Sequence, residues 1–324
     1  MEAVFANAMN LQWQQIVMWI IGGTLIYLAI RKDMEPALLL PMGFGAILVN
    51  LPMSGAVTQI YEGVKEIGVI DLLFDSGIAN ELFPLLLFIG IGAADGPTSI
   101  FVANYFKSDY LGPIIVAAYS YMALVPIVQP PVIKMMTTKK ERLIRMQYTN
   151  TKVTQLTKIL FPIVVTIIAG IVSPRSVALI GFLMFGNLLR ECGVLNSLSE
   201  TAQKVLANLI TLFLGITIAA RMTADAFLNA QTLMILGLGL IAFIFDTIGG
   251  VLFAKVMNLF VKNKVNPMIG AAGISAFPMS ARVVHKMGLA EDNQNFLLMH
   301  AVGANVSGQI ASVIAGGLIL NFFG

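Results

Sequence analysis

The stretch that decides the fold is FPLLLFIGIGAADGPTSIF, residues 83–101. It begins as an apolar segment, then carries one carboxylate, Asp95, followed directly by Gly96 and Pro97. A proline inside a helix removes a backbone hydrogen bond and kinks or breaks the helix. The stretch therefore predicts an apolar helix that is interrupted at a charged residue.

The composition of the chain places this stretch in a membrane protein. Of the 324 residues, 57% are hydrophobic and 11% are charged, with a mean hydropathy of +0.85. Soluble domains carry about 25% charged residues. We predict an all-α, polytopic transmembrane helical bundle that forms a single domain over residues 1–324. The single cysteine, Cys192, excludes a disulfide framework. We find no P-loop, dinucleotide fingerprint or zinc-ligand spacing, and we expect no nucleic-acid partner.

About ten hydrophobic segments follow one another, but several fall short of the roughly 20 residues that a helical span needs. The segment 37–52 contains Pro41, Gly43 and Gly45, and we expect it to be broken or re-entrant. The N-terminus does not resemble a cleavable signal, so we expect the first segment to be a retained span. The other segments are 12–30, 81–93, 111–128, 159–173, 176–189, 203–220, 231–260, 265–281 and 296–320.

The longest polar interruption covers residues 134–158. It holds seven Lys or Arg residues against one acid, Glu141. The positive-inside rule predicts that this basic loop is cytoplasmic, that Arg31 and Lys32 face the same side, and that the N-terminus lies outside. A second reading is that the loop docks an acidic partner.

Two of the short segments resemble each other. They are IGAADGPTSIF, residues 91–101, and IGAAGISAFPM, residues 269–279. Irregular backbone inside a membrane persists only where it is buried in protein or lines a cavity. Paired broken segments indicate the binding site of a transporter with repeated halves. We therefore predict broken or re-entrant helices and a degraded inverted repeat.

Asp95 is the first candidate site residue. A carboxylate at mid-membrane depth costs about 2.5–3.5 kcal/mol on insertion scales, so it needs a partner or a function. It can be protonated and inert, paired with a buried arginine, or a ligand for a cation. With a hydroxyl from Thr98 or Ser99 and carbonyls freed by the break, it forms an oxygen set suited to a hard cation.

A second polar cluster lies in NKVNPMIGAAGISAFPMSARVVHK. Asn266 and Ser275 offer neutral oxygens, and Arg282 offers a planar, permanently positive fork for a carboxylate. The alternative for Arg282 is an interfacial arginine whose side chain reaches toward the headgroups.

A third set of polar residues lies inside apolar segments. His300, Asn305, Ser307 and Gln309 can line a site or form hydrogen bonds between helices. Tyr119 and Tyr121 are two residues apart on one helix, so they point to different faces and one of them can serve the site while the other packs. Asp246 is a further acid that we expect to be buried, in a relay or at the cap of a broken helix.

Long blocks of the chain closely resemble one known family. The blocks are GAADGPTSIF, AAYSYMALVPIVQPPVIKMMTTKKERLIRM, FGNLLRECGV, KNKVNPMIGAAGISAFPMSARV and NFLLMHAVGANVSG. They resemble the beta subunit of the sodium-pumping, biotin-dependent decarboxylases of oxaloacetate, methylmalonyl-CoA and glutaconyl-CoA. The resemblance covers nearly the whole chain.

This resemblance implies an activity and partners. The chain would be a carboxybiotin decarboxylase subunit that removes CO2 from carboxybiotin, exports Na+ and takes up a proton. The biotin would be carried by a biotin-carrier/carboxyltransferase subunit and not by this chain, and a small membrane subunit would complete the complex. The protein would be a multi-pass protein of the bacterial inner membrane.

The resemblance also implies roles for seven residues. Asp95, Tyr121 and Arg282 would be catalytic, with Tyr121 as a proton donor or an oxygen ligand. Arg282, Asn266 and Gly270 would bind the substrate. Four oxygen-bearing residues would bind Na+, namely Asp95, Ser275, Asn305 and Asn266.

The chain departs from the family in one place. In the family, a block like FPLLLFIGIGA leads into an intramembrane aspartate motif and several more helices before a separate GADGPT block. Here residues 83–93 run directly into the motif of Asp95. We therefore predict that part of the first repeated half is absent, with the join near residue 93.

Two other functions remain open at this point. One is a non-enzymatic, Na+-coupled secondary transporter of a small carboxylate. The other is an inactive assembly subunit that anchors its partners in the membrane.

Overall fold

The computed structural model describes most of the chain. The described residues are 11–32, 36–52, 54–61, 64–90, 95–108, 110–147, 153–172, 174, 177–274, 276 and 279–323. Within these ranges, the description does not extend to the side chains of residues 61, 95, 97, 120, 122, 123 and 172.

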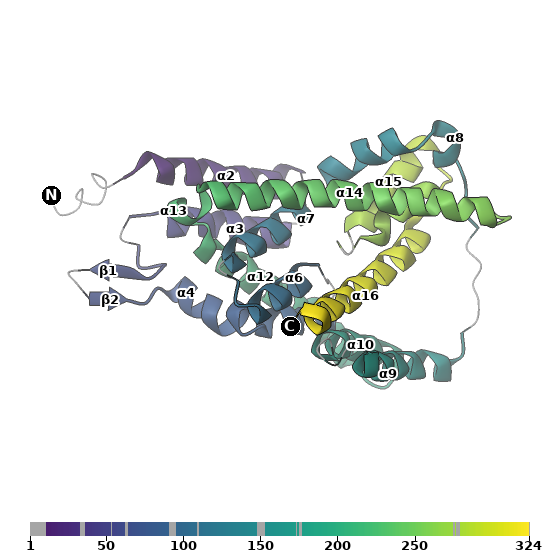
Figure 1. Cartoon of the computed structure of the whole chain (residues 1–324), viewed down its shortest axis with the longest axis horizontal. Helices are drawn as coiled ribbons and strands as arrows, with labels where there is room; N and C mark the ends of the chain where they lie inside the picture. Colours follow the sequence, from purple (N-terminus) through teal and green to yellow (C-terminus); the bar gives the residue numbers. More distant parts are fainter. Residues whose placement is uncertain are drawn as a thin grey trace.

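The predicted all-helical bundle is confirmed. The strands among the described residues are β1 (Gln59–Tyr61) and β2 (Val64–Glu66), which pair as an antiparallel hairpin. Figure 1 shows α14 (Ala230–Phe260) as a long helix that extends to the end of the molecule opposite the hairpin. The hairpin lies at one end, which we call the hairpin end, and α8 (Lys139–Arg142) lies at the other, which we call the loop end.

The other elements are pieces of very different length. They are α2 (Trp13–Lys32), α3 (Pro36–Val49), α4 (Val69–Phe74), η1 (Asp75–Ala79), α5 (Leu82–Gly90), α6 (Asp95–Tyr105), α7 (Leu111–Met136), α9 (Gln155–Val172), α10 (Val177–Glu191), α11 (Asn196–Glu200), η3 (Thr201–Leu206), α12 (Ala207–Ile218), η4 (Ala219–Arg221), α13 (Ala224–Phe227), η5 (Pro267–Gly273), α15 (Met279–Glu291) and α16 (Leu298–Phe323).

Several helices are suited to a membrane. Among the described residues, four are long and apolar enough to cross one, namely Trp13–Lys32, Asn196–Arg221, Ala230–Phe260 and Leu298–Phe323. Two bent pairs raise the number of candidate spans to as many as six.

The two bent pairs carry the interruptions. The segment Val69–Ala79 is followed by α5 at an angle of 63°, and the two parts of α7, Leu111–Tyr119 and Leu124–Met136, meet at 67°. Pro126 lies just beyond the bend in α7. A proline has no N–H for the carbonyl four residues earlier, which accounts for a kink at this place.

The prediction that residues 37–52 form a broken segment is wrong. The helix α3 is continuous and contains Pro41. Its glycines serve close packing instead, since a Cβ atom added to Gly43 would lie 2.6 Å from the carbonyl oxygen of Gly22 on α2. Small residues let two helix backbones approach each other in a membrane, and the tight pair of α2 and α3 follows from them.

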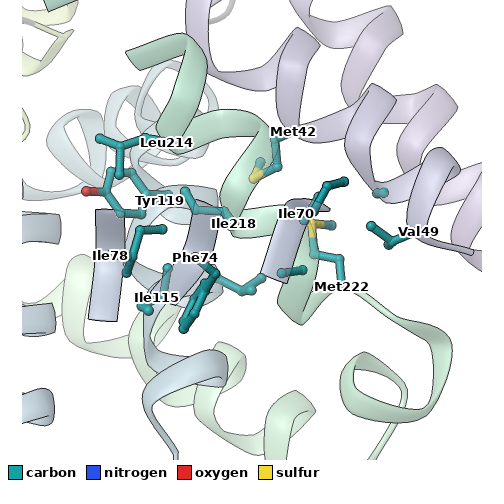
Figure 2. Close-up of a cluster of buried hydrophobic side chains, with 14 of the residues drawn as sticks. Met42, Val49, Ile70, Phe74, Ile78, Ile115, Tyr119, Leu214, Ile218 and Met222 are labelled. Atoms are coloured by element: carbon teal, nitrogen blue, oxygen red, sulfur yellow. The ribbon is translucent and has the colours of Figure 1, made fainter. Parts of the chain in front are cut away.

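Three hydrophobic cores hold the bundle together. At the hairpin end, side chains of α3, α4, α7 and α12 pack around Phe74 and Ile218, and Figure 2 shows them converging. At the loop end, the second part of α7 packs with α14, η5 and α15 around Val125 and Met268. The third core joins α5, α9, α10 and α16 around Phe88.

Where η5 crosses α14, the two backbones nearly touch. A Cβ atom added to Gly250 would lie 2.2 Å from the carbonyl oxygen of Gly270, whereas one added to the adjacent Gly249 would meet nothing within 4 Å. We therefore expect Gly250→Ala to destabilise the protein by about 1–3 kcal/mol through overpacking. We expect Gly249→Ala to be neutral or slightly stabilising, because alanine is the better helix former.

Heat denaturation of the purified protein in detergent measures this difference. Equal melting temperatures of the two variants would show that the crossing of η5 and α14 is not as close as described.

Candidate functional site

The break predicted near Asp95 falls at residues 91–94, which lie outside the described part of the chain, so it stays a prediction. The described residues of α5 end at Gly90, and those of α6 begin at Asp95. A proline in the first turn of a helix costs no bond within the helix, so Pro97 is compatible with a helix that starts beside the carboxylate. The side chain of Asp95 lies outside the described part of the chain, so its role as a Na+ ligand stays a prediction.

The helix α16 contacts both of the segments that were predicted to be broken, η5 and the start of α6. Gly308 packs against η5 with almost no space, since a Cβ atom there would lie 1.9 Å from the carbonyl oxygen of Gly273. Gly316 packs in the same way against Thr98 of α6. Eight residues of α-helix span about 12 Å. The segment around η5 and the start of α6 are thus about 12 Å apart along α16.

Asn305 lies about one turn before Gly308 on α16, beside η5. It is fully buried, and its Nδ2 donates to the carbonyl oxygen of Ile274 just after η5. Its Oδ1 is buried and has no hydrogen-bond partner among the described residues. The amide therefore joins two elements with its nitrogen and leaves its oxygen available for a ligand. Ser275, the next predicted Na+ ligand, lies outside the described residues.

Asn266 holds η5 to the loop end. It is 0% exposed, and its Nδ2 donates to the carbonyl oxygens of Arg142 at 3.0 Å and Ile144 at 2.9 Å. Its Oδ1 accepts from the backbone N–H of Met268 at 3.1 Å and caps η5. Gly270, the predicted substrate-binding glycine, forms the close contact with Gly250 described above. In this structure both residues fix the position of η5.

Residues 137–147 form a strap across the loop end. Arg142 pairs with Glu291 of α15 at 2.6 Å, and Arg145 pairs with Asp292 at 2.5 Å. The hydrogen bond from Arg145 holds the pKa of the Asp292 carboxyl below its usual value. The strap therefore links the basic loop to η5 and to the end of α15. The predicted loop at 134–158 is only partly a loop, since α7, α8 and α9 extend into it.

We expect Asn266→Ala to loosen this strap. The substitution removes the two hydrogen bonds to carbonyl groups and leaves buried polar atoms unpaired. Each unsatisfied group lowers the stability by about 1–3 kcal/mol. Limited trypsin digestion should then cut faster at Lys139, Lys140 and Arg142. The control is Asn229→Ala, which removes an asparagine cap at the start of α14, at the hairpin end. Equal cleavage of the strap in both variants would contradict this role.

Arg282 lies on α15 and lines a pocket of about 560 Å³ near the loop end. Four cationic side chains surround the pocket, and its acidic residue, Glu291, is already paired with Arg142. A concave site with an excess of positive charge attracts and holds anions. The cationic side chains are Lys32, Lys134, Arg282 and Lys286.

The two tyrosines of α7 face different elements, as predicted. The ring of Tyr121 stacks on Phe243 of α14, with 6.1 Å between the ring centroids. Tyr121 also lines a cavity of about 310 Å³ with Ser99 of α6. The hydroxyl of Tyr119 points instead to the start of α6, where a Cβ atom on Gly96 would lie 3.0 Å from it.

The prediction that Asp246 is buried is wrong. It lies on an exposed face in the middle of α14, which is uninterrupted there, so it caps no broken helix. The sequence could not predict that Asp246 is exposed, because α14 is apolar on all sides and its pattern does not mark a buried face.

The sequence did not single out three of the pocket residues. Their charges were interpreted only as topology signals or as part of an interfacial group. The structure shows that they come from three separate helices that meet around Arg282, and they are Lys32, Lys134 and Lys286. Positive charges at helix ends are common in membrane proteins, so charge alone could not mark these residues.

A family profile and several curated proteins match this chain. The profile of the beta subunit of Na+-transporting oxaloacetate decarboxylase matches residues 14–94 and 91–323. The methylmalonyl-CoA decarboxylase subunit beta of Propionigenium modestum is 40% identical over 382 residues, covering 97% of this chain and 96% of that protein. The glutaconyl-CoA decarboxylase subunit beta of Acidaminococcus fermentans is 42% identical over 361 residues, covering 96% and 94%. The oxaloacetate decarboxylase beta chain of Klebsiella pneumoniae is 37% identical over 417 residues, covering 97% and 96%.

These matches confirm the predicted internal absence. Each alignment is longer than the 324 residues of this chain, so each relative carries residues that have no counterpart here. The profile matches in two pieces that meet at residues 91–94, where the join was predicted. With matches over nearly its whole length, the chain belongs to the family of beta subunits of Na+-transporting oxaloacetate decarboxylases.

Proposed function

We propose that this chain removes CO2 from carboxybiotin delivered by a biotin-carrier/carboxyltransferase subunit and couples the reaction to Na+ export. The observation that carries the proposal is the pocket at Arg282. It has the size of a small-molecule site, about 560 Å³, and four cations around it. It also lies beside the strap, since its lining residue Glu291 pairs with Arg142. The family name supports Na+ transport and decarboxylation, and the pocket supports an anionic substrate.

The chemistry of decarboxylation gives a role to two of the predicted catalytic residues, Arg282 and Tyr121. The guanidinium of Arg282 binds the carboxylate on the biotin nitrogen through paired hydrogen bonds. Breaking the bond between nitrogen and carbon releases CO2 and leaves an electron pair on the ureido nitrogen, which takes up a proton. Tyr121 is the proposed donor of that proton, which is replaced from solvent. One proton is therefore consumed for each CO2 released.

Na+ is the cargo of the reaction. Asp95 is proposed as its ligand at the start of α6, and Ser275, Asn305 and Asn266 are proposed as its ligands around η5, about 12 Å away along α16. Gly270 is proposed to keep η5 close to α14 beside the substrate. The free Oδ1 of Asn305 supports this assignment, since a buried amide oxygen without a donor suits a hard cation.

The complex is proposed to contain a small membrane subunit as well. We place the protein in the bacterial inner membrane, with the loop end and residues 134–158 in the cytoplasm and the N-terminus outside. Carboxybiotin then reaches Arg282 from the cytoplasm.

Avidin sensitivity tests the proposal. The purified complex is offered oxaloacetate, methylmalonyl-CoA or glutaconyl-CoA, the acids named for the relatives. We expect CO2 release from one of them, and avidin should abolish it by sequestering biotin. Activity that persists with avidin would exclude a carboxybiotin reaction. If the protein alone, without any biotin protein, accumulates a carboxylate when a Na+ gradient is imposed, it is a secondary transporter.

A further inference from the structure

Two buried hydroxyl groups lie at the start of α6. Among the described residues, Tyr119 Oη and Thr98 Oγ1 are buried there without a hydrogen bond. Thr98 belongs to α6, and Tyr119 belongs to α7, which packs on α6. Buried polar groups are nearly always paired, with protein, water or a ligand. Two unpaired hydroxyls at one helix start therefore indicate a ligand.

Tyr119 gives the clearest geometric evidence for a ligand at this place. It is 3% exposed, and its ring belongs to the core at the hairpin end. Figure 2 shows its oxygen pointing away from the cluster around Phe74 and Ile218. A Cβ atom on Gly96 would lie 2.7 Å from Cζ of this ring and 3.0 Å from its oxygen. Only a glycine at this position lets the hydroxyl reach the backbone next to Asp95.

Thr98 lies in the same first turn of α6. It is 5% exposed, and its Cγ2 packs against Gly316, while its Oγ1 is without a partner. A hydroxyl can donate one hydrogen bond and still offer lone pairs to a cation. Carboxylate and hydroxyl oxygens are the ligands that hard cations prefer.

We propose that the hydroxyls of Tyr119 and Thr98 are ligands of the exported Na+ at the start of α6, beside Asp95. This rests on the proposed function, in which Asp95 binds the ion. Tyr119 is then the tyrosine of the ion site, and Tyr121, stacked on Phe243 of α14, belongs to the decarboxylation step.

The test compares Tyr119→Phe with a control, Tyr27→Phe, which removes an exposed hydroxyl on α2, in the purified full chain. The measurement is protection from heat denaturation as NaCl is increased at constant ionic strength, with choline replacing Na+. In Tyr119→Phe we expect the midpoint of Na+ protection to rise about tenfold, because a hydrogen bond or ligand to a charged group is lost. Without Na+ this variant should be as stable as the parent or more so, since an unpaired hydroxyl has been removed. Tyr27→Phe should keep the parental midpoint.

A second pair of variants does not depend on the tyrosine ring. Thr98→Val removes the hydroxyl and keeps the shape, and it should raise the Na+ midpoint, whereas Thr98→Ser should not. If Tyr119→Phe and Thr98→Val both keep the parental midpoint, the proposal is overturned and the hydroxyls are merely unpaired. If they keep it while Asp95→Asn loses protection, only this proposal fails. A parent that Na+ does not protect at all would overturn the proposed function as well.

Discussion

Asp95→Asn is expected to abolish Na+ uptake by sealed inverted vesicles that contain the whole complex. The substitution keeps the shape of the side chain and removes the negative charge that the ion requires. A carboxylate in a low-dielectric site interacts with a cation far more strongly than a neutral amide does. We expect the apparent affinity for Na+ to fall by at least about a hundredfold, which corresponds to roughly 3 kcal/mol. The measurement is uptake of radioactive Na+ after substrate is added.

The matched control is Asp246→Asn. This second intramembrane acid is exposed on α14 and lies outside the proposed site. It should keep Na+ uptake within about twofold of the parent, as expected of a substitution away from the chemistry. Unchanged uptake in Asp95→Asn would remove that residue from the ion site, whatever the control shows.

Arg282→Ala is expected to lower the rate of CO2 release at least about a hundredfold. It removes two charge-assisted hydrogen bonds to the carboxylate, each worth about 1.5–3 kcal/mol. Arg282→Lys should recover only part of the rate, because an ammonium keeps the charge without the planar fork. The measurement is the initial rate of CO2 release at saturating biotin-carrier subunit.

Lys286→Ala is the control for charge in the same pocket. This variant should raise the concentration of carrier subunit needed for half the maximal rate and leave the maximal rate nearly unchanged. The reason is that the lysine attracts the anion without aligning it. If Arg282→Ala retains the parental rate, Arg282 is an interfacial arginine and the pocket is not the site of decarboxylation.

The interruption at Asp95 is predicted from a local cause, since glycine and proline follow a carboxylate in an apolar segment. It stays a prediction, because residues 91–94 lie outside the described part of the chain. The same reasoning failed at Pro41, where α3 continues, because the sequence does not reveal that Gly43 packs against Gly22 of α2. The sequence alone does not distinguish a glycine that permits close packing of two helices from a glycine that interrupts a helix.

The candidate site was predictable only in part, because it depends on contacts between distant elements. Asn266 was singled out as a ligand, and the structure shows it holding the strap through Arg142 and Ile144. Of the two tyrosines, neither periodicity nor spacing could say which one faces Gly96. That depends on the way α6 packs against α7, which follows from the whole fold.

The central claim is that decarboxylation by this chain drives Na+ across the membrane. The most direct test measures CO2 release and Na+ uptake together in sealed inverted vesicles that contain the complex. The account predicts that both begin on addition of the acid or acyl-CoA, that both stop with avidin, and that withdrawal of Na+ slows CO2 release. CO2 release at the full rate without Na+, or Na+ uptake that continues with avidin, would contradict it.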